Sequence, residues 1–146
     1  MFEVGNLLLF NPFIFKNGMP PKRKFFVVLG IIEDEIVLAS LPTSKDKVPT
    51  KYDGLLGCIN DDEQRFNVFK FRAGVPVTDK GYRFTKDTFI YGEQLDTYPI
   101  SEFLKQKITD GIEICELGRI SDDVFDNLQK CLKNSAKVKR KYKRYL

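Results

Sequence analysis

The residues of this sequence best suited to chemistry are one arginine and two neighbouring hydroxyl residues that follow it by twenty positions. Arg23 lies between Lys22 and Lys24, and the hydroxyl residues are Thr43 and Ser44. A guanidinium offers a planar set of donors that matches the oxygens of a phosphate group. If the chain brings these residues together, they form a site suited to a phosphate-bearing ligand.

Two short apolar segments between these clusters predict how the clusters meet. Residues 25–29 and 36–39 are rich in β-branched and aromatic side chains, which is typical of strands. The acidic residues 33–35 between them favour a tight connection. In an antiparallel hairpin the outer ends of the two strands lie side by side, so we expect Arg23 to lie near Thr43 and Ser44.

Each of these residues also has a purely structural interpretation. The Lys-Arg-Lys run around Arg23, taken alone, is more typical of a solvated basic cluster at the start of a strand. Thr43 and Ser44 follow Pro42, where their hydroxyl groups can stabilise a turn. For the two hydroxyl residues, a role in a turn and a role in a site are compatible.

Composition limits the class of protein and the chemistry available to it. A chain of 146 residues, 42% hydrophobic and 30% charged, is typical of one ordinary globular domain. The sequence contains no histidine. Acid–base chemistry near neutral pH would therefore need other groups with shifted pKa values, and a histidine-based metal site is excluded.

The cysteines and the first apolar run bear on the compartment. The three cysteines, Cys58, Cys115 and Cys131, are odd in number and far apart, which predicts reduced and mostly buried thiols rather than a disulfide framework or a zinc site. The apolar run 7–15 is too short to span a bilayer and is broken by Asn11-Pro12. We expect a cytoplasmic protein without membrane association.

Positive charge is concentrated at the end of the chain. Residues 137–144 hold six of the 24 basic residues and no acidic one, which leaves 18 basic against 20 acidic residues, or −2, elsewhere. Such a run is typical of a solvated, disordered end. It can also add salt-sensitive affinity for nucleic-acid phosphates. We treat residues 1–136 as one domain and 137–146 as a basic tail.

The remaining patterns predict strands first and helices last. Expected strands cover 4–10, interrupted at Asn11-Pro12, then 66–71 and 88–91, with 60–65 as a charged loop and 112–117 as a strand or connector. Ser101 is expected to cap a helix over 102–107, and Ser121 a helix that ends near Asn134. One apolar stripe of the second helix is predicted to be buried: Val124, Phe125, Leu128, Cys131 and Leu132. This order indicates an α+β fold, mainly β, with a small twisted sheet or barrel and helices attached.

Four segments in this order resemble the MazF/PemK-type toxins of bacterial toxin–antitoxin systems, also described as Kid- or CcdB-like. They are Gly5-Asn6-Leu7-Leu8-Leu9, the run Lys22 to Leu29, the run Leu41 to Thr50, and the run Phe84 to Thr97 with its Glu93-Gln94 pair. The amphipathic helix after Ser121 is similar to the closing helix of that family. The resemblance implies a strongly twisted, SH3-like barrel that acts as a homodimer.

The resemblance also implies an activity. Such toxins cleave single-stranded RNA without a metal or other cofactor, and a cognate antitoxin protein with an acidic segment neutralises them. By position, Arg23 would stabilise the charge of the phosphorane, and Thr43 would orient the 2′-hydroxyl group or the phosphate. Residues expected to bind the substrate are Ser44, Lys22, Lys24 and Lys45. The basic tail could dock the acidic segment of the antitoxin.

Two departures from the family pattern keep other functions open. Lys24 stands where the family usually has proline, and Asp96 stands where it has arginine. The second hypothesis is therefore a catalytically degenerate module of the same fold that binds nucleic acid or an antitoxin-like partner. A third is an inhibitor of gyrase, as in a related branch of the fold, but the Arg23 and Thr43 pattern favours the ribonuclease branch.

Overall fold

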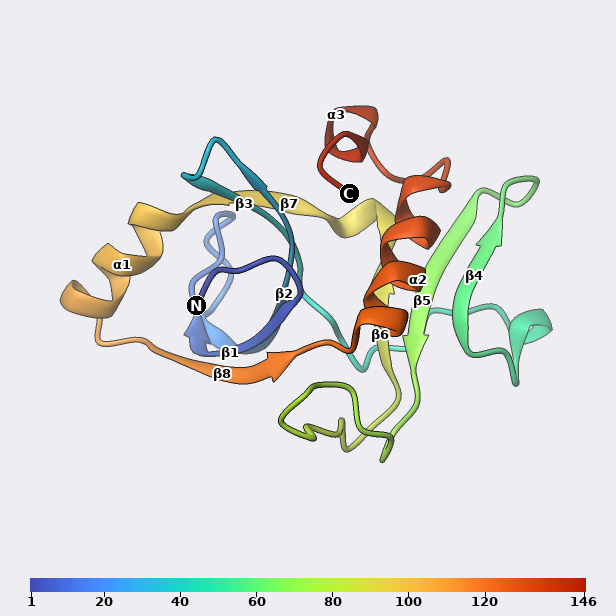
Figure 1. The fold of residues 1–146 in the computed structure, drawn as a ribbon, viewed down its shortest axis with the longest axis horizontal. Helices are drawn as coiled ribbons and strands as arrows, with labels where there is room; N and C mark the ends of the chain where they lie inside the picture. Colours follow the sequence, from blue (N-terminus) through green and yellow to red (C-terminus); the bar gives the residue numbers. More distant parts are fainter.

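The computed structural model describes residues 1–146, and its eight strands form two antiparallel sheets (Figure 1). The five-stranded sheet contains, in spatial order, β7 (Asp96–Pro99), β3 (Ile36–Ser40), β2 (Lys22–Ile32), β1 (Asn6–Phe13) and β8 (Glu113–Arg119). The three-stranded sheet contains β4 (Gly57–Asp61), β5 (Phe66–Phe71) and β6 (Thr88–Tyr91). The helices are α1 (Ile100–Thr109), α2 (Asp122–Lys133) and α3 (Arg140–Lys143), with 3-10 turns η1 (Thr50–Tyr52) and η2 (Gly92–Gln94). The mainly β, α+β prediction is confirmed, but the two sheets form no closed barrel.

The predicted hairpin is the centre of the five-stranded sheet. β2 pairs antiparallel with β3, from Ile32 opposite Ile36 to Val27 opposite Ser40. The turn residues Glu33 and Asp34 both have positive φ angles, 52° and 58°, which is the conformation of the two-residue turns that match strand twist. The expected connection over 33–35 is thus confirmed.

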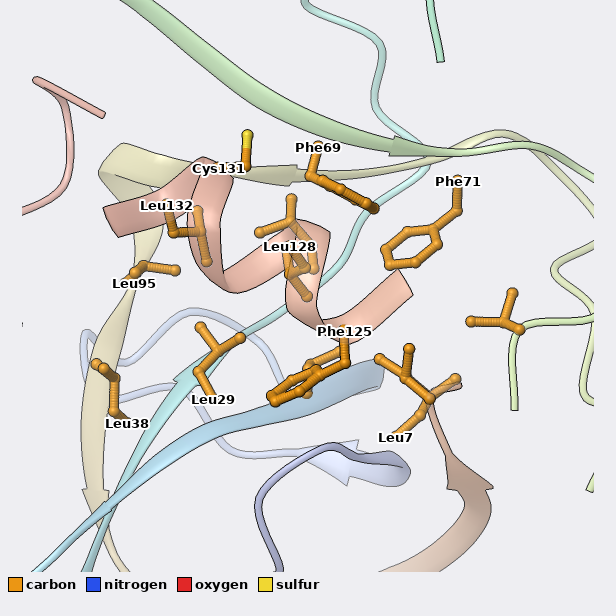
Figure 2. Close-up of a cluster of buried hydrophobic side chains, with 14 of the residues drawn as sticks. Leu7, Leu29, Leu38, Phe69, Phe71, Leu95, Phe125, Leu128, Cys131 and Leu132 are labelled. Atoms are coloured by element: carbon orange, nitrogen blue, oxygen red, sulfur yellow. The ribbon is translucent and has the colours of Figure 1, made fainter. Parts of the chain in front are cut away.

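One helix joins the two sheets into a single core (Figures 1 and 2). α2 lies between them, and its buried Phe125, Leu128 and Leu132 face Leu7 and Leu29 of the five-stranded sheet. On the other side the same helix packs against Phe69 and Phe71 of β5 (Figure 2). The predicted apolar stripe of this helix is confirmed, with Val124 only half-buried. The three-stranded sheet therefore has a fixed position relative to the hairpin.

The opposite face of the five-stranded sheet has its own aromatic core. Phe10, Phe13 and Phe26 pack there against Phe103 of α1 and Tyr98 of β7. Because side chains alternate along a strand, neighbouring residues of β2 enter different cores. This double burial explains why residues 25–29 form an uninterrupted apolar run.

The first strand continues through Asn11-Pro12, so the predicted interruption is wrong. β1 extends from Asn6 to Phe13, and its pairing with β2 shifts register between Phe10 and Phe13. Pro12 lies within that shift, where the strand needs no N–H donor from this residue. Sheets accommodate proline at such irregular positions. β4 corrects a second expectation, because Asn60 and Asp61 belong to this strand rather than to a loop.

The helix boundaries agree only in part with the predicted ones. α2 begins after Ser121 and ends before Asn134 as expected, although the Ser121 side chain makes no capping hydrogen bond. α1 begins at Ile100, so Ser101 lies inside the helix and not at its cap. The Ile100 N–H group donates instead to the carbonyl of Glu35, at 2.9 Å. No helix of the structure combines the length and apolar character needed to span a bilayer.

The basic tail is ordered, so its interpretation as a disordered end is wrong. Val138 and Tyr142 are buried in the core that contains α2. Gly30 of β2 lies against the tail, and a Cβ atom at this position would clash with the carbonyl of Tyr145. Tertiary packing of its apolar residues thus holds the tail on the domain, while Arg140 and Lys141 remain exposed.

The prediction of three reduced, mostly buried thiols is also wrong. Cys58 of β4 and Cys131 of α2 form a disulfide across 73 residues of sequence. Cys115 is free and exposed. The pair could not be deduced from spacing, because the two residues meet only once α2 has packed on the three-stranded sheet.

Candidate functional site

A gap opens where the hairpin strands part. β3 ends at Ser40, and the chain then turns toward β6, where the Thr43 N–H group donates to the Phe89 carbonyl at 3.0 Å and the Phe89 N–H group to the Thr43 carbonyl at 2.8 Å. Before Val27, β2 therefore has a partner strand on its β1 side only, for example at Lys24 opposite Phe10. The first residues of β2 and the segment 42–45 become the two walls of an open depression.

This depression, called here the Arg23 depression, brings all the predicted site residues together. Its volume is about 360 Å³. It is lined by Lys22, Arg23, Lys24, Phe25, Pro42, Thr43, Ser44, Lys45, Phe84, Thr85, Lys86 and Thr88. Five of these residues are cationic and none is acidic. The chain thus has a second concentration of positive charge besides its tail, and it coincides with the candidate site.

Arg23 is exposed and has no carboxylate partner. Its neighbour Phe25 fixes the strand here by packing against Tyr82 and Phe84, with ring centroids 5.8 and 4.9 Å apart. Burial raises the pKa of Tyr82, and the nearby positive charge of Arg23 partly offsets that rise. The guanidinium is therefore close to this aromatic wall, and its donors remain available to a ligand.

The Thr43 hydroxyl group supports the local turn. Its oxygen accepts a hydrogen bond from the Lys45 N–H group at 3.2 Å, which agrees with the turn interpretation of this residue. A hydroxyl group that accepts one bond still has its own proton to donate, so the turn does not exhaust its capacity. The adjacent Ser44 is exposed.

Tyr91 supports the site from outside the lining of the Arg23 depression, and the sequence did not reveal this role. Its hydroxyl group accepts from the Lys47 N–H group at 2.8 Å and donates to the Lys45 carbonyl at 2.7 Å. These two bonds attach the loop after Thr43 to β6. The sequence did not indicate these hydrogen bonds, because Tyr91 is 46 residues from Lys45 and lies in an ordinary strand pattern.

Lys24 is the residue of the Arg23 depression with a lowered pKa. Burial of its ammonium group is the main cause, and the positive charges of Lys22 and Lys45 add to it. A lysine of this kind releases its proton more readily than a solvated one. In a chain without histidine, Lys24 is thus a candidate for proton transfer.

Residues 85–88, at the start of β6 and just before it, supply further lining residues and another cation. Thr85, Lys86 and Thr88 line the depression, and the sequence alone did not indicate a role for them. Asp87, which lies between them in the sequence but does not line the depression, pairs with Lys70 at 3.6 Å and accepts from the Ala73 N–H group at 2.8 Å. Its charge is therefore compensated outside the site.

The site as a whole is a cationic, hydroxyl-rich depression without carboxylates. Arginine, lysine and hydroxyl side chains bind phosphate oxygens well and are poor ligands for Mg²⁺ or Zn²⁺. The geometry thus favours an anionic ligand that these side chains bind directly. The chain matches no protein-family model, no curated protein and no solved structure.

Proposed function

We propose that this protein is a MazF/PemK-like endoribonuclease toxin that cleaves single-stranded RNA without a metal ion. The observation that carries the proposal is the meeting of Arg23 with Thr43 and Ser44 in one depression lined by cations and without carboxylates. A reaction at a phosphate group needs donors of this kind to bind its oxygens and to stabilise its charge. The same positive surface suits the acidic segment of a cognate antitoxin, and the active form is a homodimer in this proposal.

The proposed reaction is an internal transfer of the phosphoryl group. The 2′-hydroxyl oxygen of one nucleotide attacks the adjacent phosphorus and loses its proton, and the bond from phosphorus to the 5′-oxygen breaks. The 5′-oxygen takes up a proton, so the products are a 2′,3′-cyclic phosphate and a 5′-hydroxyl end. Arg23 stabilises the charge of the phosphorane, and Thr43 orients the attacking hydroxyl group or the phosphate.

Substrate binding in this proposal is the task of the surrounding cations. Lys22, Lys24 and Lys45 hold the anionic strand together with the hydroxyl group of Ser44. Lys24 is the half-buried cation of this set, and burial and its cationic neighbours lower its pKa in the free protein. Because fixed donors are often the largest single contribution to such catalysis, the absence of histidine does not exclude the reaction.

The test is incubation of the purified protein with a long single-stranded RNA in the presence of EDTA. We expect discrete fragments with 5′-hydroxyl ends from the wild type, and none from Arg23→Ala or Thr43→Ala. Arg72→Ala is the matched control, because it removes an exposed arginine outside the depression and should cleave normally. Thermal melts of all variants separate loss of activity from loss of fold.

The outcomes distinguish the proposal from its alternatives. Failure of the wild type to cleave several unrelated RNAs would reject the ribonuclease and favour a degenerate module that only binds. Cleavage that survives both substitutions would leave the activity and reject the assigned site. The binding module is favoured by the departures at Lys24 and Asp96 and by the use of the Thr43 oxygen in a local turn.

A further inference from the structure

A second depression adjoins the first on the other side of the β2 end. Its volume is about 440 Å³, and it is called here the Phe15 depression. It is lined by Phe15, Asn17, Met19, Lys22, Lys24, Leu41, Thr43, Lys45, Lys47, Tyr91 and Gln94. Lys22, Lys24, Thr43 and Lys45 line both depressions, so the two form one continuous surface.

The two depressions differ in chemistry. The Arg23 depression has two aromatic residues in its lining, Phe25 and Phe84, and cations and hydroxyl groups dominate it. The Phe15 depression has more apolar side chains and also contains the amides of Asn17 and Gln94. Its apolar and aromatic residues are Phe15, Met19, Leu41 and Tyr91. An apolar wall, amides and cations in one place match a heterocyclic base attached to a phosphate.

The loop that carries Phe15 is held in place. The Phe15 ring packs against the buried Phe13 with centroids 5.2 Å apart. The neighbouring Lys16 forms an ion pair with Asp96 at 3.2 Å and also donates to the carbonyl of Thr97. A ring held in this way loses little freedom when a planar ligand stacks on it, which favours binding.

Positive charge lies over that ring. The Lys22 ammonium group is 5.9 Å from the centroid of Phe15, and Lys22 itself lines both depressions. A phosphate in the Arg23 depression and a base on Phe15 would therefore share this cation. The arrangement matches one nucleotide step of an unpaired strand.

We propose that the Phe15 depression binds the base of the nucleotide adjoining the phosphate held in the Arg23 depression. The ligand is then a single-stranded nucleic acid at least two nucleotides long. The inference rests on the proposed function for the phosphate site but does not require cleavage. A duplex does not fit, because its bases are stacked on each other and closed to an aromatic side chain. An acidic peptide would use the cations but not the ring and the amides.

The test measures binding apart from cleavage. The probe is a fluorescein-labelled 2′-O-methyl RNA hexamer, which lacks the attacking hydroxyl group, and its affinity is followed by fluorescence polarisation. Pyrophosphate, measured by calorimetry, has no base and therefore reports on the Arg23 depression and the cations that both depressions share. The variants are Phe15→Leu, which keeps an apolar side chain without the ring, and Phe15→Trp, which keeps a stacking surface. Phe2→Leu is the matched control, since Phe2 packs on Phe103 away from both depressions.

We expect Phe15→Leu to weaken binding of the hexamer by about tenfold and to leave the affinity for pyrophosphate unchanged. Phe15→Trp and Phe2→Leu should bind the hexamer as the wild type does. Unchanged hexamer affinity in Phe15→Leu would overturn the inference. An equal loss of affinity for the hexamer and for pyrophosphate would also overturn it, because the ring would then only position the cations that both depressions share. If a hexaglutamate peptide competes as strongly as the unlabelled hexamer, and Phe15→Leu does not change this competition, the surface would be assigned to an acidic protein segment instead.

These results are separable from those for the proposed function. A wild type that binds the hexamer through Phe15 but cleaves no RNA keeps the base site and rejects the ribonuclease. Normal cleavage of RNA by Phe15→Leu, with normal affinity for the hexamer, rejects the base site and leaves the ribonuclease standing.

Discussion

Thr43 and Phe89 are joined through their backbones by two hydrogen bonds, 3.0 and 2.8 Å long, which link the end of the central hairpin to the three-stranded sheet. This link draws the segment after Ser40 away from β2. The open edge of β2 and the depression beside it are consequences of that divergence. The position of the Thr43 hydroxyl group therefore depends on both sheets.

The first prediction concerns that hydroxyl group. Thr43→Val keeps the branched shape and the backbone link but removes the hydroxyl, so we expect a folded protein whose cleavage rate is about 100-fold lower. Thr43→Ser should retain most of the activity. Single-turnover cleavage of a fixed RNA, with a thermal melt of each variant, provides the measurement. Full activity of Thr43→Val would mean that the hydroxyl serves only its bond to Lys45.

The second prediction is a pH dependence set by Lys24. Bound phosphate favours the charged form of this lysine, whereas burial and the charges of Lys22 and Lys45 lower its pKa in the free protein from 10.5. Pyrophosphate also ionises in this range, so the wild type is compared with Lys24→Arg, whose side chain stays charged. The affinity of the wild type relative to Lys24→Arg should be constant while free Lys24 is protonated and fall as the pH rises through its lowered pKa. Calorimetric titrations between about pH 7 and pH 10.5 test this, and identical profiles would contradict it.

The third prediction concerns the ion pair between Lys16 and Asp96. Asp96→Lys places two cations together and should loosen the Phe15 loop, weakening the RNA hexamer by about two- to fivefold, as expected for a half-exposed pair. The exchanged variant Lys16→Asp with Asp96→Lys should restore much of the loss. Fluorescence polarisation of the wild type, both single variants and the exchanged variant gives the coupling between the two residues. An exchanged variant no better than Asp96→Lys alone would show that the pair does not position the loop.

The fourth prediction concerns the disulfide. Because it closes a loop of 73 residues, the chain-entropy model assigns it a stabilisation of about 4 kcal/mol. Cys58→Ser should lower the free energy of urea unfolding by up to this amount, and reduction of the wild type should do the same. Cys115→Ser, which changes the free and exposed thiol, is the control and should be neutral. A wild type with equal stability in oxidising and reducing buffer would contradict the prediction.

The fifth prediction concerns the contact between Gly30 and Tyr145. A methyl group at Gly30 has no space beside the Tyr145 carbonyl, so Gly30→Ala should destabilise the protein by about 1–3 kcal/mol. In a chain that ends at Arg144, the same substitution should have a much smaller effect. Urea unfolding of the four proteins forms a double-mutant cycle. Additive effects would show that the tail does not press against β2.

Local patterns were enough to predict several parts of the fold. The apolar segments and the acidic turn over 33–35 predicted the hairpin that places Arg23 beside Thr43, because strand periodicity and turn chemistry act over a few residues. The boundaries of α2 were predicted for the same reason. The assignment to toxin and ribonuclease stays a prediction based on resemblance.

The sequence by itself determined which residues could meet at the end of the hairpin, and the tertiary structure decided what they form. The carboxylate-free depression exists because Thr43 pairs with Phe89 and Tyr91 holds the following loop. The Cys58–Cys131 bond and the packed tail depend in the same way on contacts between distant segments. Such contacts leave no local pattern, because each arises only when helices and sheets pack together to bury their apolar faces.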